Sequence, residues 1–181
     1  MKVSPTELAG VVLIEPDVYG DERGFFVETF QAERYLEAAG IAMPFVQDNH
    51  SRSRRGVLRG LHLQTARPQG KLVRVSRGEV YDVAADINPA SPTFGRWVAA
   101  ILSDENQHQL WIPPGYAHGY LVLSEVADFE YKCTDYYDRN SEAGVIWNDP
   151  DLRIDWPVTT PSLSEKDRLL PTLAELQSRR S

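Results

Sequence analysis

The sequence predicts an all-β fold, either a sandwich or a jelly roll, from strand-length runs, a two-residue periodicity and regular turn signals. From Phe45 onward apolar and polar residues alternate with a period of two, which is the side-chain period of a β-strand. Short β-rich runs recur between clusters of Gly, Pro, Asn and Asp, as at residues 88–92 and 113–115. This pattern is typical of a sandwich or jelly roll and not of alternating strand–helix units.

The elements follow in order along the chain. Residues 11–14 form a short apolar strand, residues 20–24 a turn, and residues 25–29 a second extended segment. Residues 31–39 form the first helix, because Gly40 stands where a helix C-terminus favours glycine. The remaining strands are predicted at residues 57–64, 71–76, 79–87, 97–102, 109–112, 119–123 and 128–134.

Two short helices are predicted near the C-terminus. Ser162 and Glu165 have the spacing of a capping box, in which each side chain satisfies a free backbone N–H of the other residue. Thr172 and Glu175 repeat this signal and predict a final helix that extends to about Arg180.

Composition limits the class of protein. The chain has 181 residues with no internal repeat, so residues 1–181 are expected to form a single domain. A net charge of −7 argues against bulk nucleic-acid binding. No run of roughly 18 apolar residues is present, so no membrane span is expected. The single cysteine, Cys133, cannot form an intrachain disulfide, and with no signal-peptide pattern it indicates a cytoplasmic protein.

Positive charge is concentrated in one segment of this acidic chain. Residues 51–82 hold eight of the nineteen Lys and Arg residues, and one histidine, His62, lies among them. A lone histidine in a strand is more often a core residue with its nitrogens satisfied. The nearby cations Arg59 and Lys71 favour the other interpretation, a site for an anionic ligand beside an acid–base residue.

A second histidine follows a rigid turn. The spacing Pro113-x-Gly115-x-x-His118 matches the second half of the cupin pattern, although a hairpin turn with an incidental histidine has the same spacing. A metal-binding cupin also needs His-x-His and a downstream Glu in its first half. Here Gln64 replaces the second histidine, and no Glu lies between it and Lys71. Two histidines without a carboxylate make a poor Fe or Zn site, so no metal is expected.

Other polar and aromatic residues are candidates for acid–base chemistry or ligand binding. Tyr131 lies in a predicted strand, where a tyrosine either packs or donates a proton opposite a general base. Tyr136 and Tyr137 offer an aromatic face for a planar base. The amide-rich segment 47–50 is either an ordinary loop or a set of groups that holds a sugar. Asp167 is either solvated or positioned to orient an imidazole.

Several short motifs carry a resemblance that extends over nearly the whole chain. They are Asp21-x-Arg23-Gly24-Phe25-Phe26, Gln47-Asp48-Asn49-His50-Ser51, Leu58-Arg59-Gly60-Leu61-His62, Pro68-Gln69-Gly70-Lys71-Leu72-Val73, Pro113-x-Gly115-x-Ala117-His118-Gly119, Tyr131-Lys132-Cys133-Thr134-Asp135-x-Tyr137, Trp147-Asn148-Asp149-Pro150 and Ser164-x-Lys166-Asp167. In this order they resemble the dTDP-4-dehydrorhamnose 3,5-epimerase family. So many ordered motifs are more specific than the cupin spacing alone.

The resemblance implies a cupin-type double-stranded jelly roll without metal or other cofactor, built as a homodimer whose N-terminal segments contribute to the partner's site. The implied reaction is epimerisation at C3 and C5 of dTDP-4-dehydro-6-deoxy-D-glucose to dTDP-4-dehydro-L-rhamnose, a step of dTDP-L-rhamnose biosynthesis. Its substrate is a nucleotide sugar, with no nucleic acid or membrane as partner.

The resemblance also implies roles for individual residues. His62 would be the general base, Asp167 its partner, Tyr131 the general acid and Lys71 the cation at the ketone oxygen. The implied substrate-binding residues are Arg23, Glu28, Gln47, Asp48, Asn49, Arg59, His118, Tyr137, Glu142 and Lys166. Among them the two arginines would meet the diphosphate, Tyr137 would stack on thymine, and Arg23 and Glu28 would come from the neighbouring subunit.

Alternatives remain open from the sequence. Strict alternation places Arg59 and His62 on opposite faces of one strand, so a β-bulge or a strand start near Gly60 is required. A relative that epimerises only C5 or only C3 would carry the same acid and base. A non-catalytic nucleotide-sugar-binding cupin is disfavoured, because a binder has no need of His62, Tyr131 and Lys71 together. Nucleic-acid binding by the short basic run 51–55 is a weaker alternative in this acidic chain.

Overall fold

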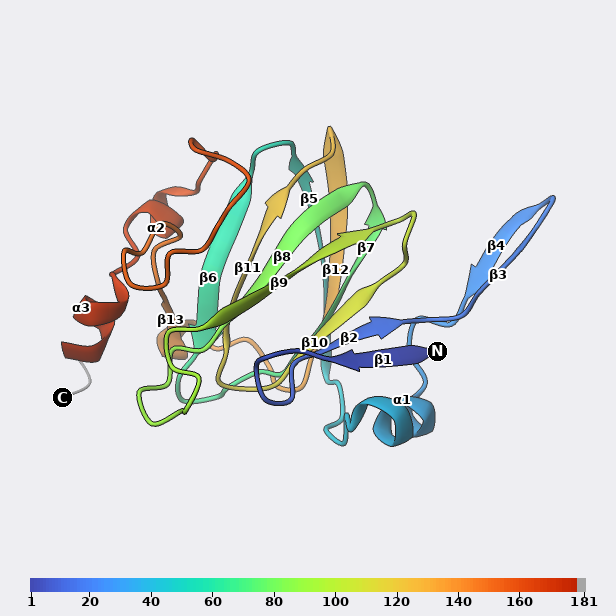
Figure 1. The fold of residues 1–181 in the computed structure, drawn as a ribbon, viewed down its shortest axis with the longest axis horizontal. Coiled ribbons are helices and arrows are strands. Elements are labelled where there is room, and N and C mark those ends of the chain that lie inside the picture. Colours follow the sequence, from blue (N-terminus) through green and yellow to red (C-terminus); the bar gives the residue numbers. More distant parts are fainter. Residues whose placement is uncertain (179–181) are drawn as a thin grey trace.

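Two antiparallel β-sheets face each other and form the body of the molecule (Figure 1). The computed structural model describes residues 1–178. The larger sheet has six strands, which in spatial order are β1 (Lys2–Pro5), β2 (Val12–Glu15), β10 (Gln109–Ile112), β7 (Lys71–Arg77), β12 (Val126–Cys133) and β5 (Gln47–Arg54). The smaller sheet has five, which are β13 (Glu142–Gly144), β6 (Leu58–Gln64), β11 (Ala117–Val122), β8 (Glu79–Ala85) and β9 (Trp97–Ser103).

The N-terminal hairpin lies apart from both sheets. Its strands β3 (Val18–Asp21) and β4 (Gly24–Val27) pair only with each other and project away from the rest of the molecule (Figure 1). Helix α1 (Ala32–Ala39) follows, and its C-terminus has Gly40 in the left-handed conformation with φ of 69°. A glycine there avoids the steric cost of a Cβ, so the helix predicted at residues 31–39 is confirmed with its cap.

The core fills the space between the sheets. Phe129, Val73, Val80 and Leu102 are buried there, and Tyr120 stacks on Phe129 with ring centroids 4.0 Å apart. Burying an aliphatic or aromatic side chain of this size contributes about 1.5–3 kcal/mol. The two sheets therefore stabilise each other mainly through this layer, and the predicted jelly-roll fold is confirmed.

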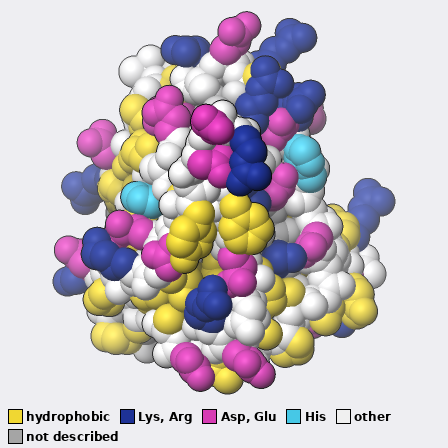
Figure 2. Space-filling view, turned by 90° about the vertical axis from the view of Figure 1, so that its right-hand side faces the viewer, with side chains coloured by type: hydrophobic (Ala, Val, Ile, Leu, Met, Phe, Trp, Pro, Cys, Tyr) yellow, Lys and Arg dark blue, Asp and Glu magenta, His cyan; other side chains and the backbone are white. Residues whose placement is uncertain are grey.

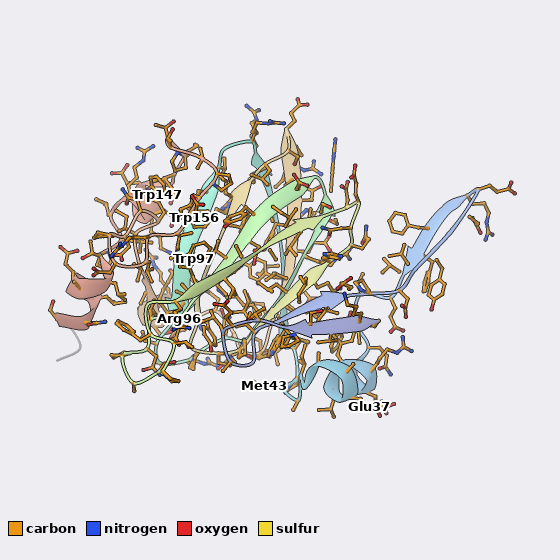
Figure 3. The ribbon with its side chains drawn as sticks, in the orientation of Figure 1. Glu37, Met43, Arg96, Trp97, Trp147 and Trp156 are labelled. Carbon is orange, nitrogen blue, oxygen red and sulfur yellow. The ribbon has the colours of Figure 1, made fainter. Side chains whose placement is uncertain are left out.

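A second apolar layer covers the outer face of the five-stranded sheet. The chain after β13 folds over this face, and Trp97, Trp147 and Trp156 lie along the contact (Figure 3). The indole N–H of Trp156 donates to the Trp147 carbonyl at 2.8 Å, and that of Trp97 donates to the Leu152 carbonyl at 3.1 Å. This layer holds the C-terminal segment, with helices α2 (Glu165–Arg168) and α3 (Leu173–Ser178), against the sheet.

Backbone hydrogen bonds attach the C-terminal segment beside β6. Leu58 N donates to the Ser162 carbonyl at 3.0 Å, and Ser162 N donates to the Gly56 carbonyl at 2.8 Å. Ser162 is therefore extended, and the N-cap of α2 is Ser164, whose hydroxyl accepts from Asp167 N. The prediction that Ser162 caps this helix is wrong, because its backbone groups are already used in pairing.

The last predicted helix has the expected start. Thr172 and Glu175 form a reciprocal pair, in which Thr172 N donates to Glu175 Oε2 at 2.8 Å and Glu175 N donates to Thr172 Oγ1 at 3.3 Å. Helix α3 is described as far as Ser178, and the predicted extension to Arg180 lies outside the described residues. Among residues 1–178, no helix is both long and apolar enough to cross a membrane.

Of the two possibilities near Gly60, a β-bulge or a strand start, the structure has the bulge. His62 pairs with His118, and Arg59 pairs with Tyr120. The interval from 59 to 62 on β6 therefore contains one residue more than the interval from 118 to 120 on β11. Gly60 has φ of 108°, and a Cβ there would lie 2.6 Å from Gly119 Cα. The extra residue brings Arg59 and His62 to the same side of the strand, which strict alternation forbids.

Candidate active site

A cavity of about 440 Å³ lies between the two sheets, beside the C-terminal segment. An adjoining hollow of about 300 Å³ shares His62, Lys71 and Tyr131 with it. We call the two together the central cavity. The strands β6 and β11 supply one wall, β5, β7 and β12 supply the other, and the α2 region closes one side. Of the predicted site residues, those lining it are Gln47, Asn49, Arg59, His62, Lys71, His118, Tyr131, Tyr137, Glu142, Lys166 and Asp167.

His62 and Asp167 form a hydrogen-bonded pair across 105 residues of sequence. His62 Nε2 lies 2.5 Å from Asp167 Oδ1, and the Ser164 hydroxyl donates to Asp167 Oδ2 at 2.8 Å. Burial alone raises the pKa of Asp167, but the hydrogen bonds to His62 and Ser164 outweigh burial and hold this pKa below its usual value. The carboxylate therefore stays ionised and accepts from Nε2, which leaves Nδ1 of His62 able to accept a proton.

Tyr131 lines both parts of the central cavity from the six-stranded sheet. It is held between Asn49 of β5 and Val73 of β7, so its backbone is paired on both sides. Burial raises the pKa of the Tyr131 phenol to about 12. The phenol is thus protonated at neutral pH and able to donate, while His62 reaches the cavity from the opposing sheet.

Lys71 begins β7 and is paired with Cys133 of β12. Its ammonium group makes no hydrogen bond or ion pair with any residue of the described chain. Burial lowers the pKa of Lys71, and the nearby ionisable groups of Cys133, Asp82 and Glu142 act in the opposite direction. A buried cation without a partner is costly, so this group is available to an oxygen atom of a ligand.

His118 lies opposite His62 on the neighbouring strand β11. Its Nε2 lies 2.9 Å from Asp82 Oδ2, and both side chains are buried. Burial lowers the pKa of His118 more than Asp82 raises it, so the ring is neutral at neutral pH. Asp82 was not among the sequence-based candidates, although an isolated acidic residue in an apolar strand is a recognisable signal.

Arg59 supplies free positive charge at the cavity. Its guanidinium donates to Ser53 Oγ from Nε at 3.1 Å and from Nη2 at 3.0 Å, and it has no carboxylate partner in the described chain. Ser51 Oγ lies 2.8 Å from the Tyr120 hydroxyl on the same wall. Sequence reasoning missed these neighbours because β5 was not recognised as a strand.

The hollow beside His62 has aromatic and amide walls. The Tyr137 hydroxyl donates to Glu142 Oε2 at 2.8 Å, and Tyr137 N donates to Gln47 Oε1 at 2.9 Å. Lys166 of α2 forms an ion pair with Glu142. The Tyr137 ring remains about half exposed, which leaves a face for a planar group.

Three predicted residues lie away from the central cavity. Arg23, at the tip of the β3–β4 hairpin, pairs with Asp21, and Glu28 pairs with Arg34. Asp48 faces the outer side of β5, where it pairs with Lys132 at 2.9 Å. Within this one chain, the structure does not bring these side chains to His62.

The donor set of the central cavity has few metal ligands. Among residues 1–178, no group of three or more His, Cys, Asp or Glu side chains is arranged to hold a metal ion. The cavity instead gathers a histidine–aspartate pair, a protonated phenol, and the cations of Lys71 and Arg59. This arrangement is suited to proton transfer on an anionic substrate.

Comparisons with known proteins agree with this chemistry. Residues 5–175 match the family model described as dTDP-4-dehydrorhamnose 3,5-epimerase. The enzyme of that name from Pseudomonas aeruginosa is 56% identical over 169 residues, which cover 93% of each chain. A dTDP-4-dehydrorhamnose 3-epimerase from Streptomyces niveus is 38% identical and covers 97% of this chain and 85% of its own.

A solved structure is similar over nearly all of the fold. The dTDP-6-deoxy-D-glucose-3,5-epimerase from Legionella pneumophila, in complex with dTDP-4-keto-L-rhamnose, has a TM-score of 0.95 and 55% sequence identity. The match covers 98% of this chain and 95% of that one. With a family model spanning most of the chain and relatives above half identity, the chain belongs to the dTDP-4-dehydrorhamnose 3,5-epimerase family.

Proposed function

We propose that this protein epimerises dTDP-4-dehydro-6-deoxy-D-glucose at C3 and C5 to give dTDP-4-dehydro-L-rhamnose, in dTDP-L-rhamnose biosynthesis. The observation that carries the proposal is the placement of the His62–Asp167 pair and Tyr131 on opposing sheets of one cavity, with Lys71 also lining it. A pure binding protein has no need for a base facing an acid.

The first step is removal of a proton beside the ketone. A C–H next to C4=O is acidic because the electron pair left behind spreads onto the ketone oxygen as an enolate. His62 takes this proton at Nδ1, and Asp167 stabilises the imidazolium that forms. General-base catalysis of this kind contributes about 10²–10⁴-fold in rate.

Lys71 stabilises the enolate. Its ammonium group has no hydrogen-bond partner in the described chain, and it therefore supplies a donor and a charge where the ketone oxygen becomes negative. A preorganised donor at such an oxyanion contributes about 3–4 kcal/mol to lowering the barrier. The same cation serves both centres, because C3 and C5 both flank the C4 ketone.

Tyr131 returns a proton from the opposite face of the sugar ring. Its pKa of about 12 keeps the phenol protonated until the carbanion needs a proton. Abstraction from one face and donation from the other inverts the centre. Because the reaction only moves protons, its chemistry requires neither a metal nor a redox cofactor.

The remaining cavity residues bind the nucleotide. Arg59 presents a guanidinium without a carboxylate partner, and its forked donors match diphosphate oxygens. Tyr137 offers its half-exposed ring to thymine, and Gln47 and Asn49 line the same hollow. The polar groups of His118, Glu142 and Lys166 complete the substrate site in this proposal.

We further propose a homodimer in which the β3–β4 hairpin reaches the partner's site. The hairpin exposes Val18, Tyr19, Phe25 and Phe26, each by between 45% and 66%. Figure 2 shows hydrophobic side chains amid charged ones on this side of the molecule. An exposed apolar arm of this kind needs a cover, and a second copy would bring Arg23 to a diphosphate. Glu28 and the backbone of Asp48 would complete the same site.

Two further expectations complete the proposal. Residues 1–181 would act as one cupin-like domain, because both sheets share a single core layer. The cytoplasm is the proposed compartment, since Cys133 is a free buried thiol of the kind that reducing compartments maintain.

The alternative is epimerisation at one centre only, as the name of the Streptomyces niveus relative describes for C3. The test is incubation with dTDP-4-dehydro-6-deoxy-D-glucose in D₂O, followed by NMR of the sugar. Deuterium at both C3 and C5 is expected. Deuterium at one centre would favour the single-centre enzyme, and deuterium at neither would leave a nucleotide-sugar-binding protein.

A further inference from the structure

An acidic side chain, Asp82, is buried between the two sheets outside the set of groups assigned above. It lies in the middle of β8, where alternation places it on the same side as Val80 and Ala84 of the inter-sheet core. Its side chain has no exposed surface. A buried carboxylate costs several kcal/mol unless other groups compensate it, so its presence here requires a reason.

The two oxygens of Asp82 have different surroundings. Oδ2 accepts a hydrogen bond from His118 Nε2 at 2.9 Å, whereas Oδ1 is buried and has no hydrogen-bond partner in the described chain. Burial keeps His118 neutral, because it lowers the pKa of the ring more than Asp82 raises it. The imidazole therefore leaves the carboxylate charge uncancelled.

Lys71 lines the same cavity as His118, the hydrogen-bond partner of Asp82. Burial lowers the pKa of Lys71, and Asp82 is one of the groups that oppose this effect. Other ionisable groups at or beside the cavity are Arg59 and His62 of β6, His118 and Tyr120 of β11, Tyr131 and Cys133 of β12, Tyr137, Glu142 of β13, and Lys166 and Asp167 of α2.

The other cavity carboxylates already have partners. Asp167 pairs with His62, and Glu142 pairs with Lys166. Within residues 1–178, Asp82 has no hydrogen bond or ion pair with a lysine or arginine. Its charge is therefore the one least compensated by a direct contact, and Lys71 is the cation least compensated in the same way.

We propose that Asp82 is a positioning residue, which fixes the ring of His118 through Oδ2 and keeps Lys71 cationic at the substrate ketone through its charge. The role of Lys71 at the ketone rests on the proposed function. A neutral amine at this position would offer the enolate oxygen a hydrogen bond but no charge. Asp82 would thus support catalysis without touching the substrate.

The test measures the protonation of Lys71 directly by NMR of protein labelled with ¹³C at the lysine ε carbon. The chain has only the lysines at positions 2, 71, 132 and 166, and the signal of Lys71 is identified by its loss in Lys71→Met. In Asp82→Asn, the titration midpoint of this signal should fall by about one pH unit or more. The alkaline limb of the kcat–pH profile should fall with it.

Matched variants separate this role from a structural one. Glu79→Gln removes one negative charge from the start of the same strand and should leave the Lys71 midpoint unchanged. Asp82→Ala removes the same negative charge as Asp82→Asn, and it is measured instead if Asp82→Asn does not fold. An unchanged midpoint in a folded Asp82 variant would overturn the inference, even if the melting temperature fell. Because the titration needs no substrate, it decides this inference even if the proposed epimerase activity is absent.

Discussion

His62 depends on a neighbour that is distant in sequence. The carboxylate of Asp167 accepts a hydrogen bond from Nε2 of the ring, and the Ser164 hydroxyl donates to the same carboxylate, so a chain of contacts sets the orientation of the imidazole. Without the carboxylate, the ring loses both its preferred tautomer and the charge that stabilises the imidazolium. The His62–Asp167 pair therefore has to be tested at Asp167 as well as at His62.

We expect Asp167→Asn to lower kcat by about 10²–10⁴-fold while the KM for the nucleotide sugar changes little. The amide keeps the shape of the side chain but does not stabilise the imidazolium. Steady-state kinetics measures both constants. Glu165→Gln, an exposed carboxylate of the same helix, is the control and should retain full activity. Equal losses in both variants would contradict the assigned role.

Arg59 is expected to act on binding rather than on chemistry. Replacing it with alanine removes charge-assisted hydrogen bonds to the diphosphate, each of which contributes about 1.5–3 kcal/mol. The Kd for dTDP, measured by calorimetry, should therefore rise at least roughly tenfold in Arg59→Ala. Arg54→Ala, at an exposed position of the same basic segment, controls for net charge. A normal Kd combined with a reduced kcat would count against the diphosphate role.

Asp128 gives a prediction about acid stability. It accepts hydrogen bonds from Arg52 Nε at 2.6 Å and Nη2 at 2.7 Å, and these bonds lower its pKa to about 2. Because this value is below that of the unfolded chain, the ionised form stabilises the fold above about pH 4, and the effect is lost as the pH falls toward 2. Arg52 is largely exposed, so solvent screening limits the contribution to about 1 kcal/mol.

In urea denaturation at pH 7, Asp128→Asn should therefore unfold about 1 kcal/mol more easily than the unsubstituted protein. The difference should shrink as the pH is lowered from 5 to 3. A difference that stayed constant over this range would indicate lost packing instead of a lost charge interaction.

At the level of single elements, β6 is the strand on which the site depends. Its bulge turns Arg59 and His62 to one side, and it requires that neither Gly60 nor Gly119 carry a side chain. A Cβ on Gly119 would lie 2.7 Å from the Arg59 carbonyl oxygen, as close as the contact described above for Gly60. The two glycines permit the strands to approach where the bulge forms.

Gly60→Ala should lower the free energy of unfolding by about 2–4 kcal/mol, because the methyl group meets backbone atoms and φ is positive. Guanidinium denaturation measures this change. Gly56→Ala is the matched control, since Gly56 also has positive φ but a Cβ there has nothing within 4 Å. It should cost only about 1–2 kcal/mol. Similar losses in the two variants would exclude the backbone contact as the cause.

Alternation predicted the apolar strands of the barrel but not every strand of the site. The strand at 109–112 was predicted with its observed bounds, because its residues are buried on both faces. Strand β5 was missed because Gln47, Asn49 and Ser51 line a polar cavity from its inner face. The function itself removed the apolar residues from which a strand is recognised.

The bulge and the C-terminal helix show different limits of the sequence. The conflict between the faces of Arg59 and His62 predicted a bulge or a strand start, because both residues had to meet one ligand.

By contrast, Ser162 and Ser164 each stand three residues before an acidic residue, at positions 165 and 167. Only the pairing of Ser162 with β6 decides which one begins the helix, and such a long-range contact leaves no local signal.

At the scale of the whole molecule, a single chain holds an incomplete set of the expected groups. The central cavity gathers the proposed acid, base and ketone-binding cation, whereas Arg23 and Glu28 lie on or near the projecting hairpin. If a second subunit supplies them, each active site contains residues of both chains. A mixture of two inactive variants then distinguishes a shared site from a self-contained one.

We expect hybrids of Arg23→Glu and His62→Ala subunits to recover activity. In a mixed dimer, one site would combine the intact His62 of one subunit with the intact Arg23 of the other. Each mixed dimer has one good site out of two, so the purified hybrid should show roughly half of the full activity. Co-expression with two affinity tags and an NMR assay of the purified hybrid would measure it. Hybrids of His62→Ala and Tyr131→Phe subunits are the control and should recover no activity, because both residues belong to the cavity of one chain. If hybrids of Arg23→Glu and His62→Ala also recovered no activity, Arg23 would serve its own chain.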